Sequence, residues 1–352
     1  MPAGTIAVSL PGALYGAAAR ARRRWYANHP GARRRLARPV ISVGNLTVGG
    51  SGKTPAVACV ARLLLAMGER PAILSRGYAR RVASGGVTIV SDGRQVTADL
   101  DHAGDEPLML ARSVPGAAVV VAAKRYEAGR VAEDQLACTV HLLDDGFQHF
   151  ALERDVNLLM LAPRDLDDTL LPGGRLREQA AAAAAADAVI VGDATPEGAE
   201  ATARRAGVAH AFRAVTVVGP PRALDPYGAP ADLPAQAAVL AVTGIARPER
   251  FFDTVRRQGL TLAGEIPFPD HHVFSSRDVK WMVDTARQCG ASAVVTTEKD
   301  AVRLQPRLPI GVPVVWLPLE LTIEPADAFR DWLRGRLAQA RAAYAGRKAA
   351  SS

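Results

Sequence analysis

The sequence predicts an α/β protein, in which a mostly parallel sheet is flanked by helices on both faces. Short apolar runs alternate with helix-like segments along the 352 residues, and a glycine-rich motif joins the first strand to the following helix. A proline- and glycine-rich stretch, 219–234, then separates two such sets. The chain is long enough for two domains with separate cores.

The apolar runs place the strands of both domains. We expect strands at 39–43, 72–75, 118–122, 139–143, 156–161 and 188–191 in the first domain, and at 238–242, 261–266, 293–297 and 312–317 in the second. A low-complexity alanine stretch, 180–186, is expected to be helical, and a last helix spans 325–344. The expected organisation is an N-terminal segment (1–38), a first domain (39–218), a linker region (219–235), a second domain that includes the last helix (236–345), and a tail (346–352).

The motif after the first strand is Thr47-Val48-Gly49-Gly50-Ser51-Gly52-Lys53-Thr54. Strand, glycine-rich turn and helix together are the setting of a phosphate-binding loop (P-loop), whose backbone N–H groups and helix N-terminus bind phosphate oxygens. Lys53 would reach the β- and γ-phosphates, and the Thr54 hydroxyl would hold Mg²⁺. Thr47 stands where the usual pattern has its first glycine. The motif predicts binding of a nucleoside triphosphate.

Two carboxylates, Asp144 and Asp145, end an apolar strand that follows the P-loop by about 90 residues. A P-loop enzyme places its Mg²⁺-orienting carboxylate at such a position. One carboxylate would face Mg²⁺, and the other the loop or the attacking group, but the sequence leaves open which does which. Two Asp at the start of an ordinary turn is the alternative.

Other polar residues also follow expected strands or open helices. Asp105 and Glu106 begin a helix, where acidic residues are common for electrostatic reasons alone. Arg125 follows a strand, at the edge of the sheet where open α/β folds bind ligands. In the second domain, His271 and 296–300 follow strands on what should be the same edge. If the domains face each other, the His271 and Asp105 loops reach one site, although a buried, hydrogen-bonded histidine is the common alternative.

The charge of the chain is concentrated at its N-terminus. The first 68 residues contain ten basic residues and no acidic one, so the remainder carries a net charge of −2 against +8 for the whole chain. A nearly neutral body offers no surface for nucleic acid. The three cysteines are far apart, which favours a reducing compartment and argues against a disulfide framework or a zinc site.

This basic arm also contains an apolar stretch, 6–15, and the aromatic pair Trp25 and Tyr26. The stretch is too short to span a bilayer, and its arginines follow the apolar part instead of preceding it as in a signal peptide. Apolar and aromatic groups beside arginines suit a segment that lies on an anionic membrane surface. A nucleic-acid arm and a solvated, packed helix are the alternatives.

Taken together, the motifs resemble those of one family, the tetraacyldisaccharide 4'-kinases, which are the lipid A 4'-kinases of Gram-negative bacteria. The resemblance covers nearly the whole chain, and the family loop also carries threonine at the position of the first glycine. The motifs are 42–45, 47–55, 75–78, 104–107, 143–149, 171–178, 243–252, 270–272 and 297–300.

The resemblance implies a P-loop kinase with a second, smaller α/β domain across a cleft. Such an enzyme uses ATP and Mg²⁺ to phosphorylate the 4'-hydroxyl of a lipid A disaccharide 1-phosphate precursor, which gives lipid IVA. It would be peripheral to the anionic cytoplasmic face of the inner membrane, with no obligate protein partner. By similarity, Asp105, His271 and Lys53 are catalytic; Thr54, Asp144, Asp145 and Glu106 are close to the metal; and Arg125, His149 and Glu178 bind substrate.

Two other functions fit part of the sequence. A kinase for another small metabolite would leave the basic arm and the His271 loop unexplained. A P-loop ATPase acting as a membrane-associated switch would hydrolyse ATP in response to a partner and make no phosphorylated lipid.

Overall fold

The computed structural model describes residues 10–49, 52–77, 80–82, 86–192, 194–225 and 228–351. Gly50 and Ser51 of the P-loop lie outside the described residues, as does the first part of the apolar stretch, 6–9. Tyr78 of the motif 75–78, residues 1–5 of the N-terminal segment and Ser352 of the tail also lie outside them, whereas all residues expected to be catalytic, close to the metal or substrate-binding are described.

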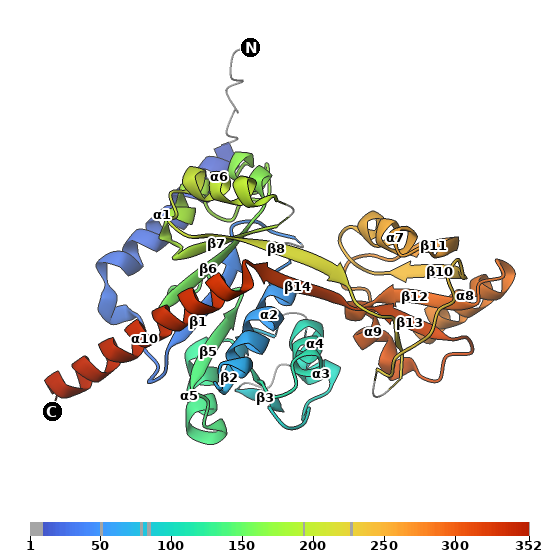
Figure 1. Ribbon diagram of the computed structural model, residues 1–352, viewed down its shortest axis with the longest axis horizontal. Helices are drawn as coiled ribbons and strands as arrows, with labels where there is room; N and C mark the ends of the chain where they lie inside the picture. Colours follow the sequence, from blue (N-terminus) through green and yellow to red (C-terminus); the bar gives the residue numbers. More distant parts are fainter. Residues whose placement is uncertain are drawn as a thin grey trace, which may run out of the picture.

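The larger domain is built on a sheet of nine strands within the described residues (Figure 1). These are β1 (Val40–Asn45), β2 (Pro71–Ser75), β3 (Thr88–Asp92), β4 (Ala118–Val121), β5 (Val140–Asp144), β6 (Val156–Leu161), β7 (Ala188–Gly192), β8 (Ala211–Val218) and β14 (Leu319–Glu324). Their order is β14-β8-β7-β6-β1-β5-β2-β4-β3. All pairs are parallel except β3 with β4 and β14 with β8. The expected fold class is therefore confirmed.

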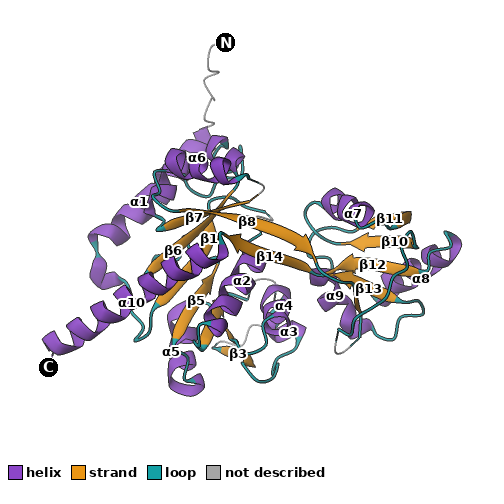
Figure 2. Ribbon diagram, in the orientation of Figure 1, coloured by secondary structure: helices purple, strands orange, loops and turns teal. Residues whose placement is uncertain are grey.

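Helices cover both faces of this sheet (Figure 2). They are α1 (Leu10–Asn28), α2 (Lys53–Ala66), α3 (Leu100–Ala103), α4 (Asp105–Ser113), α5 (Arg125–Leu136), α6 (Pro196–Ala206) and α10 (Ala326–Ser351), with 3₁₀ turns at Pro30–Ala32, Pro163–Asp167 and Ala180–Ala185. Successive residues of β1 point to opposite faces, so Val40 packs with Ala128 of α5, whereas Ile41 packs with Leu64 of α2. All four are fully buried, which is why β1 is apolar on both sides.

The smaller domain has its own five-stranded sheet in the described part of the chain. Its elements are β9 (Arg222–Ala223), β10 (Ala238–Thr243), α7 (Pro248–Arg257), β11 (Thr261–Pro267), α8 (Ser276–Gln288), β12 (Ala293–Thr297), α9 (Glu298–Leu304), a 3₁₀ turn (Gln305–Arg307) and β13 (Val314–Leu317). The strand order is β11-β10-β12-β13-β9, and only β9 is antiparallel to its neighbour. Helices α7 and α8 pack on opposite faces of this sheet, in separate apolar clusters.

The connection between the domains differs from the expected one. Strands β8 and β14 form an antiparallel ribbon that reaches from the large sheet to the small domain (Figure 1). The small domain is therefore inserted between these strands, and β14 and α10 belong to the first domain, not to the second. The expected boundaries at 236 and 345 are wrong here, because Phe329 and Leu333 of α10 are buried in the core of the first domain. Part of the expected linker is strand β9 of the second sheet.

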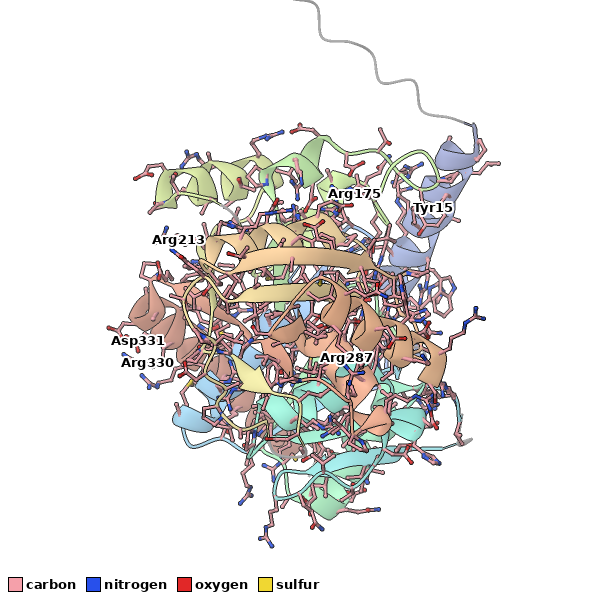
Figure 3. The ribbon with its side chains drawn as sticks, turned by 90° about the vertical axis from the view of Figure 1, so that its right-hand side faces the viewer. Tyr15, Arg175, Arg213, Arg287, Arg330 and Asp331 are labelled. Atoms are coloured by element: carbon pink, nitrogen blue, oxygen red, sulfur yellow. The ribbon has the colours of Figure 1, made fainter. Side chains whose placement is uncertain are left out.

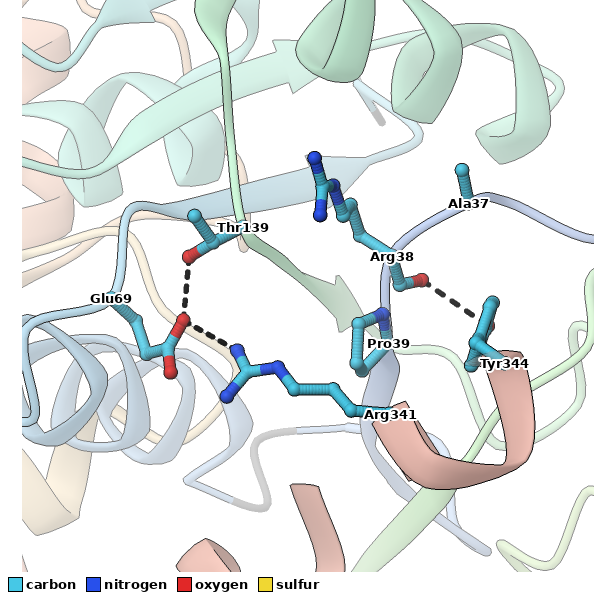
Figure 4. A pocket seen from close by; sticks show the side chains of 7 residues that line it. All are labelled: Ala37, Arg38, Pro39, Glu69, Thr139, Arg341 and Tyr344. Atoms are coloured by element: carbon cyan, nitrogen blue, oxygen red, sulfur yellow. Dashed lines mark hydrogen bonds and ion pairs between the residues drawn. The ribbon is translucent and has the colours of Figure 1, made fainter. Parts of the chain in front are cut away.

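Helix α10 also lines one side of an open pocket of about 500 Å³ beside the large sheet (Figure 4). In it, Glu69 accepts hydrogen bonds from Thr139 (2.6 Å) and Arg341 (2.7 Å). The lining residues 37–39, 69 and 139 immediately precede β1, β2 and β5, respectively. The pocket therefore lies at the opposite edge of the sheet from the P-loop, which follows β1.

Candidate active site

The P-loop begins at the carboxyl end of β1 and ends at the first turn of α2. Gly52 has a φ of +75°, a conformation open to glycine, and Lys53 follows as the first residue of α2. The Asn45 side chain donates to the Thr47 carbonyl (2.8 Å) and to its hydroxyl (3.1 Å). The Thr47 side chain is thus a buried acceptor, which gives threonine a role at the position of the usual glycine. Thr54 lies in the same turn as Lys53.

Lys53 bridges the P-loop to the end of β5. Its ammonium donates to Asn45 Oδ1 (2.9 Å) and to Asp145 Oδ1 (2.8 Å). Arg177 donates to the other oxygen of Asp145 at 2.7 Å. Asp145 has a φ of +53°, unusual for a residue with a side chain, and this turn directs its carboxylate between the two cations. Sequence reasoning gave no role to Asn45 or Arg177, because neither is distinctive outside its contacts.

The adjacent carboxylate, Asp144, has a different environment. It is 5% exposed, and Ser75 donates to it at 3.3 Å. Burial raises the pKa of Asp144 to about 7, and the negative charges of Glu106 and Asp145 add to this effect against the opposing charges of Lys53 and Arg125. Because the negative charge of Asp144 is unfavourable in this buried position, the residue is suited to bind a cation that enters the site together with the nucleotide.

The residues present fit the Mg²⁺ that the resemblance implies. Mg²⁺ is commonly held by one or two carboxylates, a hydroxyl and the phosphates of the nucleotide, and less often by a cage of protein groups. Asp144, Glu106 and Thr54 offer such donors. Asp145 fits less well, because cations already occupy both of its oxygens. Among the described residues, no cluster of three or more acidic, histidine or cysteine side chains has the geometry of a complete metal site.

The unlike environments of the two carboxylates predict opposite effects of amidation on stability. Because the pKa of Asp144 is raised in the folded protein, ionisation of this residue is less favourable in the folded state than in the unfolded state. The free energy of unfolding therefore falls as the pH rises from about 4 to about 7. Asp144→Asn should therefore raise the melting temperature at pH 8 without Mg²⁺ or nucleotide, and raise it less at pH 5.5. Each pKa unit corresponds to about 1.4 kcal/mol. Kinase activity should fall in the same variant.

Asp145→Asn is the matched control, because burial is outweighed there by Lys53 and Arg177, which lower the pKa of Asp145. Its charged form stabilises the fold above the ordinary pKa of an aspartate, so this variant should melt lower at pH 8 than the parent protein. Thermal unfolding of the three proteins at both pH values measures the difference. An Asp144→Asn protein that melts below the parent at pH 8 would contradict the assignment.

The Asp105 and His271 loops meet between the two domains. Asp105 is the first residue of α4 and 5% exposed, and its Oδ2 lies 3.1 Å from His271 Nδ1. The expectation that both reach one place is confirmed by this contact. His271 has a φ of +60°, which is strained for histidine and often marks a functional position. The neighbouring His272 bonds instead to Asp278 within its own domain (3.1 Å), which favours His271 as the partner of Asp105.

Two residues of α9, Lys299 and Arg303, complete this group. Arg303 is 7% exposed and donates to Asp105, to Asp300 Oδ1 (2.9 Å) and to the Gly244 carbonyl (2.9 Å). Burial alone would raise the pKa of Asp105, but the His271 hydrogen bond and the charges of Lys299 and Arg303 hold it well below its usual range. In the sequence, the signal for this pair of residues was their i, i+4 spacing, which puts them on the same face of a helix.

Of the three residues expected to bind substrate, two share a cavity. Arg125 and His149 line a cavity of about 300 Å³ together with three cationic or aromatic residues, Arg34, Lys124 and Tyr126, one acidic residue, Glu127, and the alanines Ala123 and Ala151. Burial lowers the pKa of Arg125 to about 10, and Arg125 Nε has no hydrogen-bond partner within the described chain. Burial and nearby arginines lower the pKa of His149 to about 4, so its ring is neutral at pH 7. Glu178 instead accepts from Arg23 of α1 (2.7 Å).

The fold and these contacts define a class of protein. A P-loop with its lysine faces an acidic strand end on one domain, and a second domain places a histidine against an aspartate of the first. This is the arrangement of a P-loop phosphotransferase.

Comparison with known proteins identifies the family within this class. Residues 6–338 match the family of tetraacyldisaccharide-1-P 4'-kinase, LpxK. The chain is 43% identical to a tetraacyldisaccharide 4'-kinase from Geobacter sulfurreducens, over 91% of this chain and 90% of that one. It is 38% identical to another from Koribacter versatilis, over 91% and 95%. A crystal structure of LpxK from Aquifex aeolicus in complex with ATP superposes with a TM-score of 0.76 at 31% identity, covering 93% and 97%. The chain belongs to the tetraacyldisaccharide 4'-kinase family.

Proposed function

We propose that the protein transfers the γ-phosphoryl group of ATP to the 4'-hydroxyl of tetraacyldisaccharide 1-phosphate and so forms lipid IVA. The family supports the reaction, and the observation that carries it on this chain is the Asp105–His271 contact across the domains. That contact supports a role for His271, from the second domain, as the proton acceptor beside the acidic residues of the P-loop domain.

The residues divide the work in the following way. Lys53 neutralises the charge of the β- and γ-phosphates, and the backbone of the P-loop binds their oxygens. Thr54, Asp144 and Glu106 are the residues that would hold Mg²⁺, which would supply positive charge to neutralise the phosphates of the nucleotide. Asp105 orients the His271 ring, and His271 takes the proton of the 4'-hydroxyl, which is otherwise a weak nucleophile.

The cationic cavity of Arg125 and His149 supplies the contacts to the acceptor. Its arginines and lysine favour a phosphorylated ligand, and the neutral His149 ring serves as a hydrogen-bonding group for sugar hydroxyls. Glu178 acts indirectly in this scheme, because its carboxylate fixes Arg23 of α1 next to Phe147 and Phe150. The N-terminal helix is thereby attached to the segment that carries Asp144 and Asp145.

A direct assay tests the reaction. Purified protein, Mg²⁺, γ-³²P-ATP and detergent-dispersed tetraacyldisaccharide 1-phosphate should give a labelled bis-phosphorylated lipid on thin-layer chromatography. Steady hydrolysis of ATP without any labelled lipid would refute the kinase proposal and favour the membrane-associated ATPase switch.

We further propose that α1 docks the protein on the anionic cytoplasmic face of the inner membrane. No helix in the described residues is long and apolar enough to cross a bilayer. Leu14 and Trp25 lie about three helical turns apart on one face of α1 and are 65% and 49% exposed. Arg22 and Arg24 flank Trp25 and are also exposed. Tyr15, 39% exposed, lies on the same helix (Figure 3).

This outer face predicts salt-sensitive binding to anionic lipid. Leu14→Glu with Trp25→Glu should sharply reduce co-sedimentation with phosphatidylglycerol vesicles, and binding by the parent protein should weaken as salt rises, because each arginine contributes about 1 kcal/mol through charge. Substitution is preferable to deletion of the arm, since the inner face of α1 holds Glu178 through Arg23. Trp281→Glu, at an exposed tryptophan of the second domain, is the matched control. Equal sedimentation of all three proteins would refute docking through α1.

A further inference from the structure

Lys299 occupies a central place in the group of residues between the domains. It is the second residue of α9, at the carboxyl end of β12, and its side chain is 19% exposed. Three carboxylates lie around its ammonium: Glu106 at 3.6 Å, and Asp105 and Asp270 at 3.9 Å each. None of these distances is that of a close ion pair. The shortest contact recorded for Lys299 Nζ in the described chain is to His271 Nε2, at 3.2 Å.

That contact identifies the accepting nitrogen on the side of the ring that faces Lys299. An ammonium has only hydrogens to donate, so Nε2 of His271 must be the accepting nitrogen. A neutral ring then carries its hydrogen on Nδ1, which lies 3.1 Å from Asp105 Oδ2 and also 3.1 Å from Arg303 Nη2, a group that itself donates to Asp105. His271 Nε2 is the atom that would take a proton from an attacking hydroxyl. In this structure, Lys299 occupies the place where that hydroxyl would bind.

The surroundings of Lys299 also connect it to the phosphate site. Glu106, its nearest carboxylate, is close enough to Asp144 to raise the pKa of that residue, and Lys53 acts on the same carboxylate with opposite sign. The acidic group is therefore flanked by Lys53 from the first domain and Lys299 from the second. Anionic oxygens of a bound nucleotide at this place would attract both ammonium groups.

Arg303, one turn further along α9, is held in place by several close contacts and differs in this respect from Lys299. Its guanidinium bonds to Asp105, Asp300 and the Gly244 carbonyl at once, and it also lies 3.1 Å from His271 Nδ1; the residue is 7% exposed. If Arg303 moved away from these partners, buried polar groups would lose their hydrogen bonds. Among the described residues, Lys299 has one hydrogen-bonding contact and three longer ion pairs, at 3.6–3.9 Å, and its flexible stem lets the ammonium exchange them for other anionic groups.

We propose that Lys299 is a further catalytic residue, which leaves His271 Nε2 when the nucleotide binds and then contacts the transferring phosphoryl group. This role rests on the proposed kinase reaction. In the step itself, the 4'-oxygen bonds to the γ-phosphorus, and the bond from phosphorus to the β,γ-bridging oxygen breaks. ADP keeps that electron pair, and the hydroxyl proton passes to His271 Nε2. Lys299 stabilises charge on the phosphoryl oxygens and has vacated the proton acceptor by then.

The test compares Lys299→Met with Lys299→Arg and with the control Lys280→Met, at an exposed lysine of α8. Lipid phosphorylation is measured together with affinity for Mg·ADP, alone and with aluminium fluoride, a mimic of the transferring phosphoryl group. Lys299→Met should lower kcat about 100-fold and weaken the fluoride complex by a similar factor, with Mg·ADP affinity unchanged. Lys299→Arg should keep part of both, and Lys280→Met should keep all.

Two results for Lys299→Met would overturn the proposal. One is an unchanged kcat. The other is a lower kcat with full affinity for the fluoride complex, which is expected if Lys299 only joins the domains. Thermal unfolding of each variant shows whether a lower activity reflects loss of the fold or loss of the contact made by Lys299. Should the parent protein phosphorylate no lipid, the assigned acceptor is wrong. The fluoride comparison without lipid would then still decide whether Lys299 contacts the phosphoryl group.

Discussion

Replacing Lys53 by alanine is expected to lower the rate of lipid phosphorylation by at least 10²–10³-fold, on the scale seen when one preorganised charge-stabilising group is removed. Lys53 is the cation that the P-loop presents to the β- and γ-phosphates, and in the structure it holds Asn45 and Asp145 in place. The loss should persist at saturating ATP, because the contact strengthens as charge develops on the transferred group. Initial rates with labelled ATP and the dispersed lipid measure it.

The fold should survive this substitution, because Arg177 still pairs with Asp145. Lys280→Ala removes an exposed ammonium that pairs with Asp284 in the described part of the chain, and it should retain full activity. A Lys53→Ala protein that folds normally and keeps more than a tenth of the parent rate would exclude the assigned role of the loop.

The second large effect concerns the pair between the domains. Asp105→Asn and His271→Ala should each lower kcat by about 10²–10⁴-fold, the usual contribution of a positioned acid–base group. Because Asp105 acts through His271, the double variant should be little worse than either single one. Effects that multiply would show that the two residues act independently and would contradict the shared role. Asp278→Asn, which disrupts the neighbouring Asp–His pair at the same 3.1 Å, is the matched control for kcat.

Asp105→Asn should also destabilise the protein at neutral pH. The pKa of Asp105 is below that of an unfolded aspartate, so its ionised form contributes stability above about pH 4, which is lost as the pH falls further. Amidation removes this contribution and one of the two carboxylates that pair with the buried Arg303 in the described chain. Because Asp300 remains, the cost should be below about 3–5 kcal/mol, the loss that is typical of an unpaired buried charge. Thermal unfolding at pH 7 measures the loss, which has the opposite sign to the gain expected for Asp144→Asn.

The sequence alone predicted the strands of the fold that are apolar on both faces. Strands such as β1 and β5 are buried continuously and show as uninterrupted apolar runs. Strands β8 and β14 escaped prediction because each has exposed residues along its length. Since they pair across 100 residues of intervening chain, their return to the first sheet has no local signal, and the domain boundary was misplaced.

The candidate site was predictable to the extent that its chemistry follows one strand or one loop. Lys53, Asp144 and Asp145 stand next to a glycine-rich motif and at a strand end, so their types and positions indicate their role. The contact of Asp105 with His271 joins residues 166 apart and depends on how the domains meet. The resemblance supplied that pair, but spacing alone did not. Lys299 and Arg303 become meaningful only when their partners are in place.

The ribbon of β8 and β14 has a consequence for the order in which the protein forms. Synthesis proceeds from the N-terminus, so all of the P-loop strand and its helix are made long before β14 and α10. Yet Ile323 of β14 and Phe329, Leu333 and Leu337 of α10 fill the same core as Val57 and Leu64 of α2. The nucleotide-binding half must therefore wait, with part of its core exposed, until the inserted domain has left the ribosome. During that interval the unpaired edge of β8 is open to association with other chains.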